Sequence, residues 1–186
     1  MRVIAGIYKG RKLRSPENHD IRPTSDKTKE AMFSMLTGRT EGARVLDLFA
    51  GSGALGIEAL SRGAKACVFV DSSRAAVRLI KENLAGCGIG EEATVRTGDY
   101  RRVLETLEGP FDIIFMDPPY DKGLAEEAFR LIDEGELLAP DGILIAEHGK
   151  NEDYPEEIHG LFREKERRYG ICKCSIYRCY TPDDMV

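Results

Sequence analysis

The sequence predicts an α/β protein built on a doubly wound, mostly parallel sheet of seven strands, a Rossmann-like arrangement. The main observation is an alternation of apolar runs, each as long as one strand, with helical stretches. Strands that are buried on both faces read as continuous apolar runs, and helical crossovers between them make the sheet parallel. Five such runs occupy residues 45–49, 66–71, 93–98, 111–117 and 142–148.

Helices and a terminal strand pair complete the predicted core. The helical stretches between the apolar runs cover residues 54–63, 72–86, 100–107 and 122–138. The tail differs, because residues 163–170 and 174–180 alternate in polarity around Gly170. Alternation with a turn signal predicts an antiparallel strand pair, which we place at the edge of the sheet.

Residues 1–43 form an extension ahead of this core. Val3 and Leu13 flank a Lys9-Gly10 turn signal, which predicts a short hairpin. A helix is expected after Pro23, where Thr24 or Ser25 can act as its N-cap. We therefore expect a basic hairpin and helix over residues 1–43, serving as an RNA-binding and cofactor-covering extension, followed by a catalytic domain over residues 44–186.

Composition narrows the class of protein. The 186 residues fit about one domain of ~100–200 residues, and 42% apolar content excludes global disorder. No apolar run approaches the ~18 residues of a membrane span, and no signal-peptide stretch is present, so we expect no membrane partner. The odd number of cysteines, five, favours reduced thiols and a cytoplasmic location.

Charge is unevenly distributed along the chain. The net charge of −5 argues against a nucleic-acid partner, but residues 1–44 carry +5 and residues 45–186 carry −10. A basic front end on an acidic body indicates a site for nucleic acid or a membrane surface. The candidates for RNA phosphate contacts are Arg2, Lys9, Arg11, Lys12 and Arg14.

A glycine loop follows the first predicted strand. Gly51, Gly53 and Gly56 match G-x-G-x-x-G, and Asp71 lies 20 residues after Gly51 at the end of the second strand. Such glycines allow a tight turn and close approach of a ligand, while the acid can bind two ribose hydroxyls. The motif alone leaves a dinucleotide and S-adenosylmethionine equally open.

Asp47 favours S-adenosylmethionine. Its carboxylate, four residues before Gly51, would repel a pyrophosphate but can receive an ammonium group. Asp99 ends the third strand, where it can accept from an adenine amino group with Tyr100 packing nearby. Asp99 is also a good N-cap for the following helix, and the two roles are compatible.

The tetrapeptide Asp117-Pro118-Pro119-Tyr120 carries the chemistry. It follows a strongly apolar strand, so it falls where open α/β sheets place ligands. Two prolines remove two N–H donors, which leaves the Asp117 carboxylate and the Pro118 carbonyl as acceptors for an amino group. Tyr120 offers a flat face for a base, and such stacking is worth ~1–3 kcal/mol.

These motifs resemble the class I S-adenosylmethionine-dependent methyltransferases, and D-P-P-Y is similar to the signature of enzymes that act on exocyclic or amide nitrogens. Nearly the whole chain resembles the bacterial 16S ribosomal RNA guanine-N2 methyltransferase family. The segments that carry this resemblance are RVIAGIYKGRKLRSP, IRPTSDKTKEAMFSML, VLDLFAGSGALGIEALSRGA and FDIIFMDPPY.

The resemblance implies methyl transfer from S-adenosylmethionine to N2 of one guanine in 16S rRNA, without a metal. We expect a monomeric enzyme that meets its rRNA within a small-subunit assembly particle. By carry-over, Asp117, Pro118, Pro119 and Tyr120 hold the target base. The implied cofactor-binding residues are Arg22, Thr24, Ser25, Asp47, Ala50, Gly51, Ser52, Gly53, Asp71, Ser72, Asp99 and Tyr100.

One departure and several alternatives remain beside this interpretation. Lys27 and Lys29 stand where the family pattern leads us to expect an arginine, although either supplies positive charge. An N6-adenine methyltransferase on DNA or RNA fits the same tetrapeptide, whereas amide-nitrogen methyltransferases favour Asn at the position of Asp117. Alternatives from other classes are a nicotinamide-binding oxidoreductase and a non-catalytic nucleic-acid-binding module. The C-terminal Cys172, Cys174 and Cys179 lack a credible fourth zinc ligand, so small buried hydrophobes are expected there.

Overall fold

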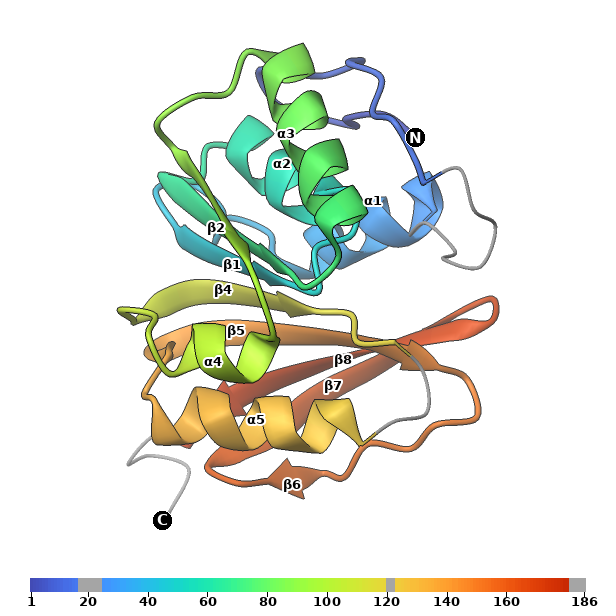
Figure 1. Ribbon diagram of the computed structural model, residues 1–186. Coiled ribbons are helices and arrows are strands. Elements are labelled where there is room, and N and C mark those ends of the chain that lie inside the picture. The colour runs from blue at the N-terminus through green and yellow to red at the C-terminus, as the bar shows by residue number, and fades with distance from the viewer. Residues whose placement is uncertain (17–24, 120–122, 181–186) are drawn as a thin grey trace.

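One twisted sheet runs through the molecule in the computed structural model, which describes residues 1–16, 25–119 and 123–180. Its strand order is β3-β2-β1-β4-β5-β8-β7-β6 (Figure 1). The strands are β1 (Arg44–Leu48), β2 (Ala66–Asp71), β3 (Ala93–Thr97), β4 (Phe111–Met116), β5 (Leu138–Gly149), β6 (Glu157–Ile158), β7 (Leu161–Tyr169) and β8 (Cys172–Cys179). The predicted α/β class is confirmed, with one strand more than the seven expected, because β6 contributes a two-residue edge.

The first five strands are parallel, and their order creates a crevice. The chain runs outward from β1 to β2 and β3, then returns to place β4 on the other side of β1. Strand order therefore reverses between β1 and β4, and the connections leave their carboxyl ends in opposite directions. Open α/β sheets bind ligands at such a switch point.

Helices cover both faces of the sheet (Figure 1). On one face lie α1 (Asp26–Met35), α2 (Ala54–Ser61) and α3 (Arg74–Cys87), and on the other lie α4 (Tyr100–Leu104) and α5 (Leu124–Glu134). Neighbouring strand residues alternate between the two cores: Val45 packs with the first layer and Leu46 with the second. Both faces of each central strand are thus buried, which accounts for the continuous apolar runs.

The predicted helix over residues 122–138 is too long at its C-terminal end. Gly135 caps α5, and an added Cβ there would lie 3.0 Å from the Leu131 carbonyl oxygen. The chain then turns, and Leu138 already pairs with Phe111 as the first residue of β5. The apolar pair Leu137–Leu138 belongs to the second core, but through the strand and its approach rather than the helix.

The N-terminal extension packs as a tight loop closed by one antiparallel bridge, Arg2 to Lys12, rather than as two regular strands. The hairpin pairing is present, since the Val3 N–H donates to the Arg11 carbonyl at 2.9 Å. Val3 and Leu13 are buried in the same core as α1, α2 and α3. The predicted Ser25 cap is confirmed, because its hydroxyl accepts from the Thr28 N–H at 3.1 Å.

A buried ion pair ties this extension to the core. Lys29 of α1 and Glu58 of α2 are both fully buried, with Lys29 Nζ 3.1 Å from Glu58 Oε2. Glu58 also accepts from the Ile4 and Ala5 N–H groups, and Lys29 donates to the Arg2 carbonyl at 2.6 Å. The first residues of the extension are therefore anchored through their backbone, which leaves the side chains of Arg2, Lys9, Arg11, Lys12 and Arg14 exposed.

The C-terminal strands extend the sheet beyond β5. As predicted, β7 and β8 form an antiparallel pair, and β8 joins antiparallel to β5. Cys172 and Cys174 are buried on one side of β8, and all five cysteines are free thiols. Within the described residues, no helix is long and apolar enough to cross a membrane.

Candidate active site

A cleft of about 1250 Å³ opens at the carboxyl ends of β1, β2, β4 and β5. This is the switch point of the sheet, where the topology predicts a ligand. Many of the residues expected from the sequence meet here: Arg14, Ser25, Asp47, Ala50, Gly51, Ser52, Asp71, Ser72, Asp117, Pro118 and Pro119.

The glycine loop shapes the floor of this cleft. Gly51 has a φ of 59°, and a Cβ placed on it would meet nothing within 4 Å, so its backbone is open to a ligand. Gly53, which does not line the cleft, begins α2 with a φ of 77°. At Gly56 a Cβ would lie 2.3 Å from the Phe69 ring, so the third glycine is needed for close packing of α2 on β2.

Asp71 and Asp47 fix the loop from two sides. Asp71 Oδ2 accepts from the Gly51 N–H and Oδ1 from the Ser73 N–H, each at 2.9 Å. Asp47 is buried below, where its Oδ2 accepts from the Gly56 N–H at 2.9 Å. Burial raises the pKa of Asp47 to about 7, the Gly56 hydrogen bond opposes that rise, and the negative charge of Asp71 adds to it.

Two carboxyls stand side by side where β4 and β5 end. Asp117 follows β4 directly, and Glu147 lies in β5 one residue beyond the Met116–Ala146 register pair. Both line the cleft, and Glu147 is 7% exposed. Burial, followed by the negative charges of Glu147 and Asp47, raises the pKa of Asp117 well above its usual range. A carboxyl of this kind suits proton acceptance from a weak acid.

Asp99 and Tyr100 lie elsewhere. Asp99 caps α4 by accepting from the Arg101 N–H at 2.9 Å. Neither Asp99 nor Tyr100 is among the residues that line the cleft. The Tyr100 hydroxyl donates to Glu127 at 3.0 Å, while burial and that hydrogen bond raise its pKa to about 12. The Tyr100 ring packs against Phe49, which lines the cleft, and the centroids of the two rings are 5.1 Å apart. Their assignment to the cofactor stays a prediction.

The five basic residues at the start of the extension are exposed, and of these Arg14 lines the cleft. Arg14 lines the cleft and pairs with Glu82 of α3 at 3.0 Å, and Arg2 pairs with Asp26 at 3.6 Å. The side chains of Lys9, Arg11 and Lys12 are exposed. Of the two lysines considered beside them, Lys27 lines the cleft, whereas Lys29 is buried against Glu58 and supplies no charge there.

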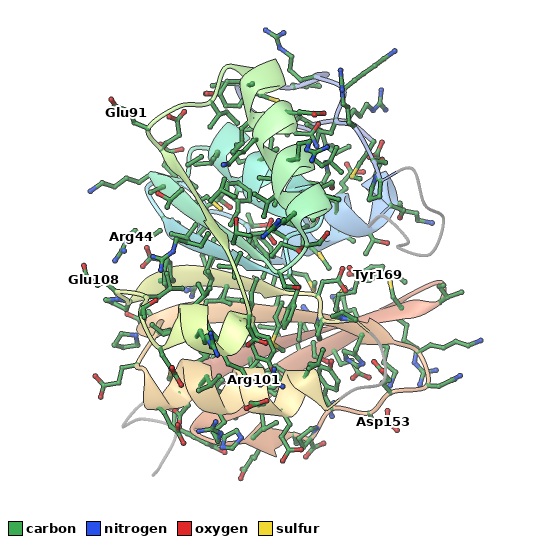
Figure 2. All side chains as sticks on the ribbon, in the orientation of Figure 1. Arg44, Glu91, Arg101, Glu108, Asp153 and Tyr169 are labelled. Atoms are coloured by element: carbon green, nitrogen blue, oxygen red, sulfur yellow. The ribbon has the colours of Figure 1, made fainter. Side chains whose placement is uncertain are left out.

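Sequence reasoning missed the wall on the β5–β8 side of the cleft. It consists of Glu147 and the β7–β8 turn, from Arg168 to Cys172. Tyr169, at the end of β7, marks this wall in Figure 2. A signal existed for Glu147, because a charged residue follows the apolar residues 143–146 there, as Asp117 follows the apolar residues 113–116. The β7–β8 turn gave none, because a strand pair at a sheet edge reads as structural.

Three predicted site residues, Arg22, Thr24 and Tyr120, lie outside the described residues. Among those described, no group of three His, Cys, Asp or Glu side chains is arranged to hold a metal ion. The donor set instead fits S-adenosylmethionine: an open glycine backbone, an acid at the end of β2, and buried carboxyls for its cationic methionine end.

This fold and this site define a class I methyltransferase, with a glycine loop after β1 and Asp-Pro-Pro after β4. The chain belongs to the family described as conserved hypothetical protein 95, whose model matches residues 1–178. It is 37% identical to the ribosomal RNA small subunit methyltransferase D of Escherichia coli, over 96% of this chain and 89% of the relative. The protein of the same name from Haemophilus influenzae is 34% identical, over 96% and 93%. A solved Escherichia coli structure superposes with a TM-score of 0.86 at 30% identity, covering 97% of this chain and 98% of the other.

Proposed function

We propose that this protein transfers a methyl group from S-adenosylmethionine to the exocyclic N2 amino group of a guanine in 16S rRNA. The observation that carries the proposal is the meeting of Asp117 and Pro118 with Gly51 and Asp71 in one cleft. An acceptor pair for an amino group and a nucleoside-binding loop are thereby brought within one site. The similarity to two rRNA small subunit methyltransferases supports rRNA as the substrate class.

The cofactor side of the cleft is the β1–β2 side. Here Asp71 is proposed to bind the ribose hydroxyls, Gly51 and Ser52 to contact the cofactor through their backbone, and Asp47 to receive the ammonium group. The cofactor supplies a methyl group on a positively charged sulfur. Asp99 is proposed for the adenine end, although it stands outside the cleft lining, and Arg22 and Thr24 are proposed as part of a covering segment.

The base side is the β4 side, where Asp117 and the Pro118 carbonyl accept the two hydrogens of the amino group. Holding both hydrogens draws the nitrogen toward a tetrahedral shape and directs its lone pair at the methyl carbon. The new N–C bond forms as the C–S bond breaks, and its electron pair goes to sulfur. N2 then loses a proton, for which Asp117 is the proposed acceptor. Orientation and electrostatics therefore carry the catalysis, with Tyr120 as a proposed stacking surface.

The RNA is proposed to approach over the basic extension, which meets the cleft at Arg14. Arg2, Lys9, Arg11, Lys12 and Arg14 supply exposed charges on residues 1–43, while residues 44–186 form the catalytic part. A guanine must leave its stack to reach the cleft, which costs a few kcal/mol, so an accessible loop nucleotide is favoured. We propose a monomer that acts in the cytoplasm on a small-subunit assembly particle, in keeping with five free thiols.

Methyl transfer from labelled S-adenosylmethionine tests the proposal. Substrates are 16S rRNA, small-subunit particles and DNA, each followed by nucleoside analysis. The expected product is N2-methylguanosine in rRNA or particles. N6-methyladenine would instead support the adenine alternative, and no transfer to any of them would refute a nucleic-acid methyltransferase.

Substitution of the proposed base-holding acid sharpens this test. Asp117→Ala should abolish transfer while leaving the affinity for S-adenosylhomocysteine, measured by calorimetry, nearly unchanged. Asp141→Ala, at an exposed aspartate near the opposite end of β5, is the matched control and should methylate like the wild type. Wild-type activity in Asp117→Ala would overturn the assigned role.

A further inference from the structure

Glu147 is a second buried carboxyl at the base side of the cleft. It lies on β5, next to β4, and the parallel register pairs Ala146 with Met116. The next residues along the two strands, Glu147 and Asp117, are therefore neighbours at the same edge of the sheet. Glu147 lines the cleft although its exposure is only 7%.

A thiol and a second carboxyl stand beside Glu147. On one side lies Cys172 of β8, whose thiol donates to the Tyr169 carbonyl at 3.3 Å, and on the other side lies Asp117. Asp47 lies below on β1. Its register partner on β4 is Phe115, two residues before Asp117. Several acids thus converge on one small volume, which favours a ligand that brings hydrogen-bond donors.

The Watson–Crick edge of guanine is such a ligand. It presents the N2 amino group and, beside it, the N1–H group, both of them donors. The Asp117–Pro118 pair can satisfy the amino group, which leaves N1–H in need of an acceptor once the base is buried. Adenine and 2-aminopurine lack a hydrogen on N1 and present a lone pair there instead.

We propose that Glu147 accepts the N1–H of the target guanine and so selects guanine over bases that carry no hydrogen on N1. The inference rests on the proposed function and names the feature of the base that is read. A carboxylate facing N1 gains a charge-assisted hydrogen bond from guanine, and it meets a repelling lone pair in the other bases. Asp117 holds the reacting nitrogen, and Glu147 holds its neighbour on the ring.

The test uses a purine that keeps the reacting amino group but loses the N1 hydrogen. RNA substrates carry either guanine or 2-aminopurine at the methylated position. For each enzyme the ratio of kcat/KM for the two substrates is measured, so that the folded fraction cancels. Wild-type enzyme should prefer guanine. Glu147→Gln should narrow this preference by about tenfold or more, because its amide can donate to an N1 lone pair.

Two controls separate recognition from folding. Glu91→Gln makes the same chemical change at an exposed position across the molecule from Tyr169 and the cleft, and should keep the wild-type ratio (Figure 2). Calorimetric affinity for S-adenosylhomocysteine should match the wild type in Glu147→Gln, which shows an intact cofactor side.

Two results would overturn the inference alone. One is an unchanged ratio in Glu147→Gln, and the other is a wild-type enzyme that methylates 2-aminopurine as well as guanine. In both cases N2-methylguanosine would still form from the natural substrate, so the proposed function would stand. A wild-type enzyme that yields no N2-methylguanosine would remove both together.

Discussion

The buried pair of Lys29 and Glu58 should be a main support of the N-terminal extension. Both side chains are fully buried, and their charged atoms are 3.1 Å apart. Lys29→Met keeps much of the side-chain volume but removes the charge and the donor to the Arg2 carbonyl. Removing one member of a buried pair typically costs about 3–5 kcal/mol, because the other charge is left uncompensated.

The structure places this substitution at the low end of that range. Glu58 keeps a second cation, since Arg62 Nε lies 2.8 Å from Oε1, and it keeps the N–H donors of Ile4 and Ala5. We therefore expect a loss of about 3 kcal/mol in the free energy of unfolding. For a chain of this size that corresponds to a fall in Tm of roughly 6–12 °C.

Urea titration of the two proteins measures this difference. The matched control is Lys27→Met on the same helix, where the side chain is exposed and a change within about 0.5 kcal/mol is expected. A loss below about 1 kcal/mol in Lys29→Met would refute the reasoning, because it would mean that the buried charge of Glu58 needs only Arg62.

Three further results are expected. Burial raises the pKa of Asp47 to about 7, so the stability that its protonated form contributes is complete below pH ~4 and is lost as pH rises through 7. In urea titrations, Asp47→Asn should therefore be more stable than the wild type at pH 8, by at most about 4 kcal/mol, and this gain should vanish toward pH 4. Gly56→Ala should lose about 1–3 kcal/mol by thermal denaturation, because its Cβ would lie 2.3 Å from the Phe69 ring, whereas Gly86→Ala, with open space on α3, should gain up to about 1 kcal/mol. Arg168→Ala, at the β7–β8 wall of the cleft, should reduce the slope of log affinity for rRNA against log salt by about one, and an unchanged slope would exclude a phosphate contact there.

The strands were predictable because both of their faces are buried, so that consecutive residues along each strand are apolar. In β4, Ile113 packs on one core and Ile114 on the other, so residues 113–116 form an apolar run without a polar gap. The boundary between α5 and β5 was not predictable in the same way. Leu137 and Leu138 suit either a helix face or a strand, and the difference lies in Gly135 and in the pairing of Leu138 with Phe111. Pairing partners distant along the chain leave no local pattern.

The candidate site divides along the same line. Gly51 and Asp71 were predictable as a pair because one strand–helix–strand unit, from β1 through α2 to β2, fixes their spacing, and Asp71 accepts from the Gly51 N–H. Lys29 was not, because its partner Glu58 lies on another helix, and a lysine within a basic segment reads as a surface charge. Asp99 differs from both. The structure shows its local role as the cap of α4, whereas the cofactor contact expected from its position at the end of β3 stays a prediction.

The placement of charge removes the conflict between an acidic protein and an RNA substrate. A nucleotide has two electrostatic faces: its phosphate carries negative charge, and the amino edge of guanine presents donors. The cleft is divided in the same way. Its floor holds the buried carboxyls of Asp47 and Glu147 and the half-buried carboxyl of Asp117, and its rim holds the exposed cations Arg14 and Arg168. A base that enters with its donor edge first would leave its phosphates among the rim cations. The net charge of −5 is therefore no measure of affinity for RNA, because in the proposed complex the acids of the site would face the base and the cofactor, not the phosphate backbone.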